Sequence, residues 1–254
     1  MAPRNAILDQ YIVNGQPNMA MRSLSQKEVN LYGEKYVLAD LNATELALFI
    51  AQFGELMSMI GSDERKIMLN RTDQYLIALR AIKQALGGVA FDGINAGDTA
   101  IGMSLIRPQF MQSNAIAGFG VGNCRLNWTL NLAAANTWQD WIFNGAGTAM
   151  TAGQTFGFVV THLKDLSLIP AVTEVRFNVG RSVLMPNDVR ALLAADTENN
   201  VALIPLQTMM VIPKASFYAR ARGDLVFGND NIGFGGLLFG LGRNLKEEIP
   251  TWLP

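Results

Sequence analysis

The chain contains very few of the residues that usually carry chemistry, with one cysteine, Cys124, and one histidine, His162, among 254 residues. A single thiol cannot form an internal disulfide, which fits assembly in a reducing compartment. We interpret Cys124 as a small buried hydrophobic residue beside a strand. With His162 interpreted as a structural residue, neither a multi-histidine metal site nor Ser-His-Asp catalysis has the residues it needs.

Charge is also scarce, because only 16% of the residues are charged and the formal net charge is −1. No long run of basic residues is present, so direct nucleic-acid binding is not expected. No apolar run reaches the length of a membrane-spanning helix, and the first ten residues lack the apolar core of a signal peptide. Half of the residues are hydrophobic. Such a chain buries a large core and keeps apolar surface for permanent interfaces.

The first half of the chain predicts an arm followed by mixed elements. Residues 1–30 show no sustained period, residues 31–41 predict a strand, and residues 46–59 fit a helix or two strands. Residues 57–69 predict two strands joined by a turn at Gly61. Apolar residues then recur at helical spacing until Gly87 and Gly88, which predicts a helix.

The second half repeats part of this order. A strand is predicted at residues 156–162, and residues 175–185 predict a strand, a glycine turn and a short strand. A helix capped by Asn187 and Asp188 is expected to follow, and then a strand at residues 201–212. This unit matches the one around residues 57–79, which favours a duplicated domain over a solenoid.

Many short strands, few helices and closely spaced turns are typical of a β-sandwich. Because the helix-bearing unit occurs twice, we predict a mainly β chain of two tandem jelly-roll sandwiches, a double jelly roll, with short inserted helices. The predicted organisation is residues 1–30 as an N-terminal arm, 31–135 as the first jelly roll, 136–154 as a linker, 155–230 as the second jelly roll and 231–254 as a C-terminal tail.

Five segments follow one another in a recognisable order: residues 32–36 (YGEKY), 57–86, 103–108 (MSLIRP), 119–133 and 175–194. Together they resemble the major coat proteins of corticoviruses, the tailless marine phages with an internal membrane. That family belongs to the double jelly-roll lineage, which includes tectivirus coats and adenovirus hexon. The resemblance lies in the order of these segments, which together span about two thirds of the chain. No single diagnostic motif carries it.

This resemblance implies a structural protein of a bacteriophage virion rather than an enzyme. The family's coat proteins form homotrimers of pseudo-hexagonal outline that tile an icosahedral shell. The implied partners are copies of the chain, other capsid proteins and an internal viral membrane touched by the arm or the tail. Assembly in the host cytoplasm and residence in the virion follow from the same resemblance, and no cofactor is implied.

Two loops carry oxygen ligands that calcium could use: Asp92, Asn95 and Asp98 in one, and Asn229 and Asp230 in the other. Ordinary turn chemistry explains the same residues, so both readings stay open. Gly118, Gly120 and Gly122 precede a strand rather than open a helix, which is typical of a turn and not of a dinucleotide loop.

Residues 232–241 (IGFGGLLFGL) could either touch a membrane surface or pack between subunits, since glycine allows close approach. Three other functions remain as alternatives. The chain could be a minor or vertex virion protein, or a carbohydrate-binding β-sandwich with Trp138 and Trp141 as platforms. It could also be a β-sandwich hydrolase such as a two-carboxylate glycosidase, which the placement of acids in turns and caps disfavours.

Overall fold

The computed structural model describes residues 24–111, 128–142, 149–151, 155–167, 171–189, 194–196 and 201–246. Its helices are α3 (Ala43–Ser58), α4 (Ser62–Leu69), α5 (Thr72–Ala85), the 3-10 helix η1 (Pro108–Phe110) and α7 (Gly242–Lys246). Its strands are β1 (Glu28–Leu31), β2 (Glu34–Val37), β3 (Phe91–Gly93), β4 (Ile101–Leu105), β5 (Thr129–Leu132), β6 (Gln139–Ile142), β7 (Met150–Thr151), β8 (Phe156–Asp165), β9 (Val172–Val179), β10 (Ser182–Val183), β11 (Asn187–Asp188), β12 (Ala194–Asp196), β13 (Val201–Val211), β14 (Ser216–Gly223) and β15 (Phe227–Leu241).

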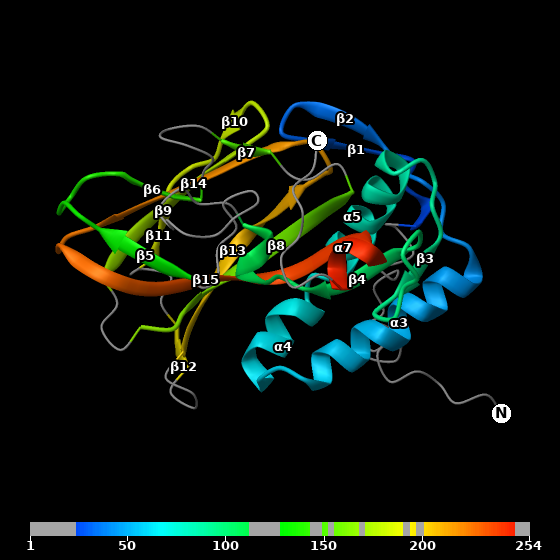
Figure 1. Cartoon of the computed structure of the whole chain (residues 1–254), viewed down its shortest axis with the longest axis horizontal. Helices are drawn as coiled ribbons and strands as arrows, with labels where there is room; N and C mark the ends of the chain where they lie inside the picture. Colours follow the sequence, from blue (N-terminus) through cyan, green and yellow to red (C-terminus); the bar gives the residue numbers. More distant parts are fainter. Residues whose placement is uncertain are drawn as a thin grey trace.

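Two mainly antiparallel sheets make up most of the fold (Figure 1). The seven-stranded sheet has the order β12-β13-β8-β15-β4-β3, and β5 also pairs with β15. The six-stranded sheet has the order β10-β9-β14-β6, with β11 on β9 and β7 on β14. Strands β1 and β2 form a separate hairpin. The chain is therefore mainly β, as predicted, and its sheets are compatible with a β-sandwich.

Aromatic rings fill the space between the two sheets. Phe158 of β8 meets Phe217 of β14 edge to face, with ring centroids 5.3 Å apart. Phe234 of β15 lies 4.8 Å from Trp141 of β6 and 5.9 Å from Phe177 of β9. Because these rings come from strands of both sheets, they join the sheets into one sandwich core.

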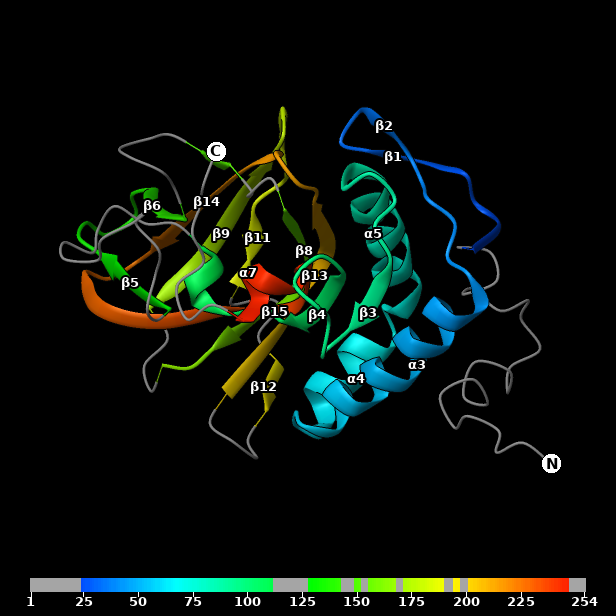
Figure 2. The same cartoon turned by 45° about the vertical axis from the view of Figure 1, so that its right-hand side comes forward.

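The other face of the seven-stranded sheet carries a layer of helices (Figure 2). Phe49 and Phe53 of α3 stack at 5.4 Å, and Phe53 lies 5.6 Å from Tyr75 of α5. Val159 and Phe239 of the sheet join this second core. Since β8 and β15 are covered on both faces, they carry nearly continuous apolar residues instead of an alternation. None of the described helices is long and apolar enough to cross a membrane.

Local sequence explains how the helices begin and end. Asn42 and Glu45 form a capping box at the start of α3, in which each side chain accepts a hydrogen bond from the other residue's backbone N–H, at 2.9 Å in both cases. The predicted helix before Gly87 and Gly88 is confirmed as α5, and both glycines have positive φ angles, +77° and +80°.

The prediction of two strands at residues 57–69 is wrong. This segment holds the end of α3 and all of α4, and Gly61 is the N-cap of α4 rather than a hairpin turn. Of the ambiguous residues 46–59, all but the C-cap Met59 belong to α3. This helix buries Phe49, Phe53 and Leu56 along one face. In the second half, β9, the Gly180 turn and β10 confirm the predicted hairpin. The two units therefore differ in structure, and the argument for a duplicated domain fails.

The double jelly roll is not confirmed. Strand β4, from the predicted first jelly roll, pairs with β15, which also pairs with β8, so strands from both halves share one sheet. The predicted linker contributes β6 and β7 to the six-stranded sheet. The prediction that residues 231–241 belong to a tail is wrong, because they form most of the interior strand β15.

Two glycines of β15 make room for aromatic rings of the same chain. A Cβ at Gly233 would lie 2.9 Å from the indole of Trp128, and one at Gly235 would overlap the ring of His162. The absent side chains let both rings lie against the strand. Cys124, residues 118–122 and most of the helix predicted after Asp188 lie outside the described residues, as do residues 1–23 of the predicted arm.

Candidate functional site

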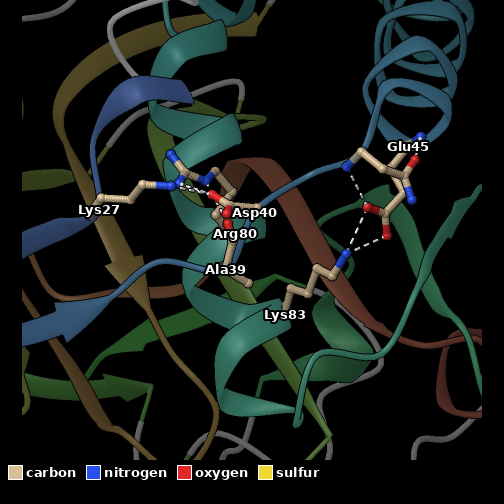
Figure 3. A network of polar contacts seen from close by, with 7 residues as sticks. Lys27, Ala39, Asp40, Glu45, Arg80 and Lys83 are labelled. Atoms are coloured by element: carbon tan, nitrogen blue, oxygen red, sulfur yellow. Dashed lines mark hydrogen bonds and ion pairs between the residues drawn. The ribbon is translucent and has the colours of Figure 1, made fainter.

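A buried charge pair lies in the helical layer, between Glu45 of α3 and Lys83 of α5 (Figure 3). The ammonium of Lys83 donates to both carboxylate oxygens of Glu45, at 2.6 and 2.7 Å. The same carboxylate accepts from the backbone N–H groups of Asn42 and Phe91, both at 2.9 Å. Burial alone would raise the pKa of Glu45, but these hydrogen bonds outweigh it and lower that pKa. Glu45 therefore fastens α3 to α5 and to β3.

A second set of charges holds the chain between β2 and α3 (Figure 3). The Arg80 side chain is fully buried and donates from Nε to the carbonyl of Ala39 at 2.7 Å. Asp40 lies 3.5 Å from the Arg80 guanidinium and 2.9 Å from the ammonium of Lys27. Both sets of contacts bind protein groups to each other, so we assign them a role in folding.

His162 belongs to a third polar network, at a bulge in β8. Strand β15 pairs Gly236 with Val160 and Gly235 with His162, which leaves Thr161 as the extra residue. The hydroxyl of Tyr75 lies 2.9 Å from that of Thr161, which is 3.1 Å from Nδ1 of His162. Nε2 of His162 lies 3.3 Å from Glu64 of α4. The bulge therefore aims two successive side chains at the helices.

This network contains the residue types of acid-base catalysis but lacks access to a substrate. The imidazole of His162 has no exposed surface, and burial lowers its pKa, so the ring is neutral near pH 7. Burial would raise the pKa of Glu64, but contacts from His162 and Lys164 outweigh it and lower that pKa. The arrangement joins α4 and α5 to the sheet, which agrees with the structural role expected for His162.

The two loops predicted as calcium ligands lie at opposite ends of β15. Asp92, Asn95 and Asp98 are exposed, and Asp98 contacts Lys246 just beyond the end of that strand, at 3.5 Å. Asn229 and Asp230 lie near its beginning. Among the described residues, no group of three or more His, Cys, Asp or Glu side chains could hold a metal ion. Calcium binding at either loop stays a prediction.

Asp230 has a clear structural role. Its fully buried carboxylate accepts hydrogen bonds from the hydroxyl of Ser167 and from the backbone N–H groups of Ala171 and Val172, the latter two at 3.2 and 3.1 Å. It thereby anchors the connection between β8 and β9. Asp165 is close by, with Oδ1 accepting from the N–H of Ser167 at 2.9 Å and Oδ2 buried without a partner. Burial and the neighbouring Asp230 raise the pKa of Asp165 to about 6.

Replacing Asp165 with asparagine is expected to stabilise the protein at pH 7. The pKa of Asp165 is higher in the folded state than in the unfolded chain. Its carboxyl group therefore binds a proton more tightly in the native state. The stability of the wild type therefore falls as pH rises from about 4 to about 6. Asp165→Asn keeps the acceptor for Ser167 and removes the buried charge. We expect a gain of about 1–2 kcal/mol at pH 7 after solvent screening is allowed for.

Urea unfolding at pH 4, 5, 6 and 7 measures this gain. The matched control is Asp230→Asn, which exchanges an acceptor for a donor facing N–H groups and is expected to destabilise the protein by about 1–2 kcal/mol. Equal stability of the wild type and Asp165→Asn at every pH would contradict the raised pKa of Asp165.

The tryptophans considered as sugar platforms have other surroundings. Trp141 is 1% exposed and belongs to the sandwich core, so it is not a platform. Trp138 is half-buried, with the guanidinium carbons of Arg176 and Arg222 at 4.8 and 5.4 Å from its ring. Trp128 packs against the core beside Phe234.

Sequence reasoning missed every polar network described above. The sequence did contain one usable signal, because Asn42 and Glu45 have the spacing of a capping box. It contained none for the partners Lys83, Thr161 or Asp165, which approach their networks only through the packing of distant elements.

No protein-family model matches the chain, and no curated protein matches it. Among solved structures, the chain is weakly similar to part of one described as infectious bursal disease virus, Gx strain, with 12% sequence identity and a TM-score of 0.17. The match covers 56% of this chain, and the chain spans only 40% of the length of that one. A similarity this weak carries no argument about function.

Proposed function

We propose that this chain is a structural protein of a virus shell, without a catalytic role, that assembles with copies of itself in the virion. The observation that supports the proposal is two separate exposed apolar sites on the sandwich, one on a turn and one along a sheet edge. Large exposed apolar side chains are suited to contacts between proteins when they stand together. A shell requires such contacts in more than one direction.

The first turn, between β14 and β15, carries Leu225 and Val226, which are 53% and 66% exposed. The second site lies along the edge of the six-stranded sheet, where Val183 of β10 and Met185 just after it are 63% and 85% exposed. Strand β9 separates Val183 from the first turn, because Val172 pairs with Gly223 beside that turn and Asn178 pairs with Val183. Six residues of strand place Val183 about 20 Å from the turn.

Two separate apolar surfaces allow an assembly that a single surface does not. One self-complementary surface produces a closed dimer, whereas two different surfaces can join chains into rings and join the rings into a lattice. The antiparallel sandwich is a suitable block for such a lattice, since its core is satisfied internally and its turns remain free for contacts.

The resemblance to corticovirus coats supports a finer form of the proposal. In that form, three chains build a capsomer of pseudo-hexagonal outline, and capsomers tile an icosahedral phage shell. The outline depends on two barrels per chain, whereas the strands of the described residues form one sandwich with a helical layer. The trimer is therefore the part of the finer proposal to test first. A minor or vertex protein of the same shell is the alternative, and its copy number in purified particles distinguishes it.

Native mass by light scattering, with negative-stain imaging of the same sample, tests the proposal. A mass of three chains of 27.7 kDa, or hexagonal particles and sheets, would support the shell assignment. A monomer that stays monodisperse at high concentration would contradict it.

Serine substitutions at the two apolar sites are expected to interrupt assembly at different stages. The pair Leu225→Ser and Val226→Ser removes one surface, and the pair Val183→Ser and Met185→Ser removes the other. Each pair alone should leave small closed oligomers, and all four together should leave monomers, because burial of these side chains provides the contact energy. Val37→Ser is the matched control, since Val37 is 54% exposed but lies on the β1–β2 hairpin. Assembly that survives all four substitutions would exclude these two sites as interfaces.

A further inference from the structure

An open groove of about 410 Å³ lies where the β1–β2 hairpin meets the turns that follow β9 and β13. In Figure 1 this hairpin lies beside β10 at the top of the view. Five of the lining side chains are charged or aromatic: Tyr32, Glu34, Tyr36, Arg181 and Lys214. The volume is in the range of sites for small ligands.

Two cations of the groove have no protein partner. Within the described part of the chain, neither the guanidinium of Arg181 nor the ammonium of Lys214 has a hydrogen bond or an ion pair. Among the described residues, most other cations are paired, including Lys35 of the same hairpin, which lies 2.5 Å from Glu28. Two free cations on one groove can bind a single anionic group.

The backbone of the groove is strained at the residues that line it. Among the described residues, Tyr32, Asn136 and Lys214 are the non-glycine residues with positive φ, and two of these three line the groove, with φ of 56° and 69°. Tyr32 occupies the first position of a two-residue hairpin turn, where asparagine or glycine is the usual residue. Left-handed conformations of bulky residues persist where the surroundings enforce them, often at ligand sites.

Hydrogen bonds hold the walls of the groove in place before any ligand binds. The hydroxyl of Tyr32 accepts from the N–H of Met210 at 3.0 Å, and its carbonyl accepts from the hydroxyl of Ser182 at 2.9 Å. Gly180 and Ser216 tie the other two turns together, through an N–H···O bond of 2.9 Å. Rigid walls reduce the entropy that binding costs.

Glu34 limits which anion fits. Its carboxylate accepts from the hydroxyl of Tyr36 at 2.8 Å and has further acceptor capacity toward the groove. A carboxylate repels a ligand with several negative charges but accepts hydrogen bonds from hydroxyl groups. The rings of Tyr32 and Tyr36 offer apolar surface beside polar tips, which suits a ring with C–H faces and hydroxyl edges.

From these observations we infer that the groove binds an acidic sugar, a polyhydroxylated ring with one carboxylate. Arg181 and Lys214 hold the carboxylate, Glu34 accepts from the ring hydroxyls, and the two tyrosines contact the ring. This site is independent of the shell proposal, because every lining residue belongs to one chain.

Titration of the full-length protein with glucuronic acid, followed by ligand-observed NMR, tests the inference. Glucose is the matched ligand control, since it lacks only the carboxylate, and inorganic phosphate is the control for a simple anion. We expect saturable binding of glucuronic acid at least tenfold tighter than that of glucose or phosphate, weakened by added salt. Absence of binding, or equal affinity for glucuronic acid and either control, would overturn the assignment.

Three variants locate the site. Arg181→Met with Lys214→Met should weaken glucuronic acid binding at least tenfold and leave glucose binding unchanged, because only the charge contact is lost. Glu34→Gln should weaken both sugars and not phosphate. Lys35→Met, on the same hairpin but outside the groove lining, is the control and should change the affinity for neither sugar. Binding that persists in the double variant would exclude the groove, and thermal unfolding of each variant verifies that it is folded.

Discussion

Replacing Lys83 with methionine is expected to lower the free energy of unfolding by about 3–5 kcal/mol. The substitution leaves Glu45, whose side chain is 4% exposed, as a buried carboxylate without its cation. Methionine keeps most of the aliphatic volume, so the loss reports the charge rather than the packing. Guanidinium-induced unfolding, followed by circular dichroism, measures the change.

Two control variants distinguish the stability lost with the buried pair from the stability lost with any single charge. Lys35→Met breaks the exposed pair with Glu28, whose side chains are 66% and 46% exposed, and is expected to cost at most about 1 kcal/mol. Glu45→Gln combined with Lys83→Met removes both charges but retains an acceptor for the N–H of Phe91, so it should recover a large part of the loss. A Lys83→Met protein as stable as the wild type would show that the pair does not hold α3 to α5.

Phe234→Ala is expected to cost about 3–5 kcal/mol, the usual range for an aromatic residue deleted from a core. Phe234 is 1% exposed and its ring contacts those of Trp128, Trp141, Phe177 and Phe217. It therefore joins the two sheets at the centre of the sandwich. Equilibrium unfolding in urea measures the loss.

The same substitution distinguishes the two descriptions of residues 231–241. If they formed a tail, as the sequence suggested, Phe234→Ala would leave the stability of the isolated chain nearly unchanged and would alter only assembly. If they form β15, the isolated chain itself is destabilised. Val183→Ala, at a side chain that is 63% exposed, is the control and should stay within about 0.5 kcal/mol of the wild type.

Predictions from the sequence succeeded where neighbouring residues decide the conformation. Helix α5 follows from apolar spacing and its terminal glycines, and the β9–β10 hairpin follows from a short alternating run ended by Gly180. The content of apolar residues and turns also indicated a mainly β chain. For the helix and the hairpin, the signal lies within about fifteen residues of sequence, which is the range over which hydrophobic periodicity and capping operate.

The strand prediction for residues 57–69 failed because short apolar runs fit either a helix or a strand. A helix signal was present in Ser62, Asp63 and Glu64, which form the first turn of α4 and place acidic groups at its N-terminus. The interpretation of Gly61 as a hairpin turn conflicts with that signal, because Gly61 is the N-cap of α4. The apparent internal repeat depended on the same error, and with it the case for two tandem jelly rolls.

The sequence alone determined the local elements with clear periods or caps, the mainly β character and the presence of one histidine and one cysteine. Only the tertiary structure decided that β15 is an interior strand, because its glycines make sense only once the rings of Trp128 and His162 lie against them. It also decided the pairing of Glu45 with Lys83 and the approach of Asp165 to Asp230. The groove beside Tyr32 likewise joins turns that are far apart in the chain. Contacts at long sequence separation depend on how whole elements pack, and no local pattern encodes that packing.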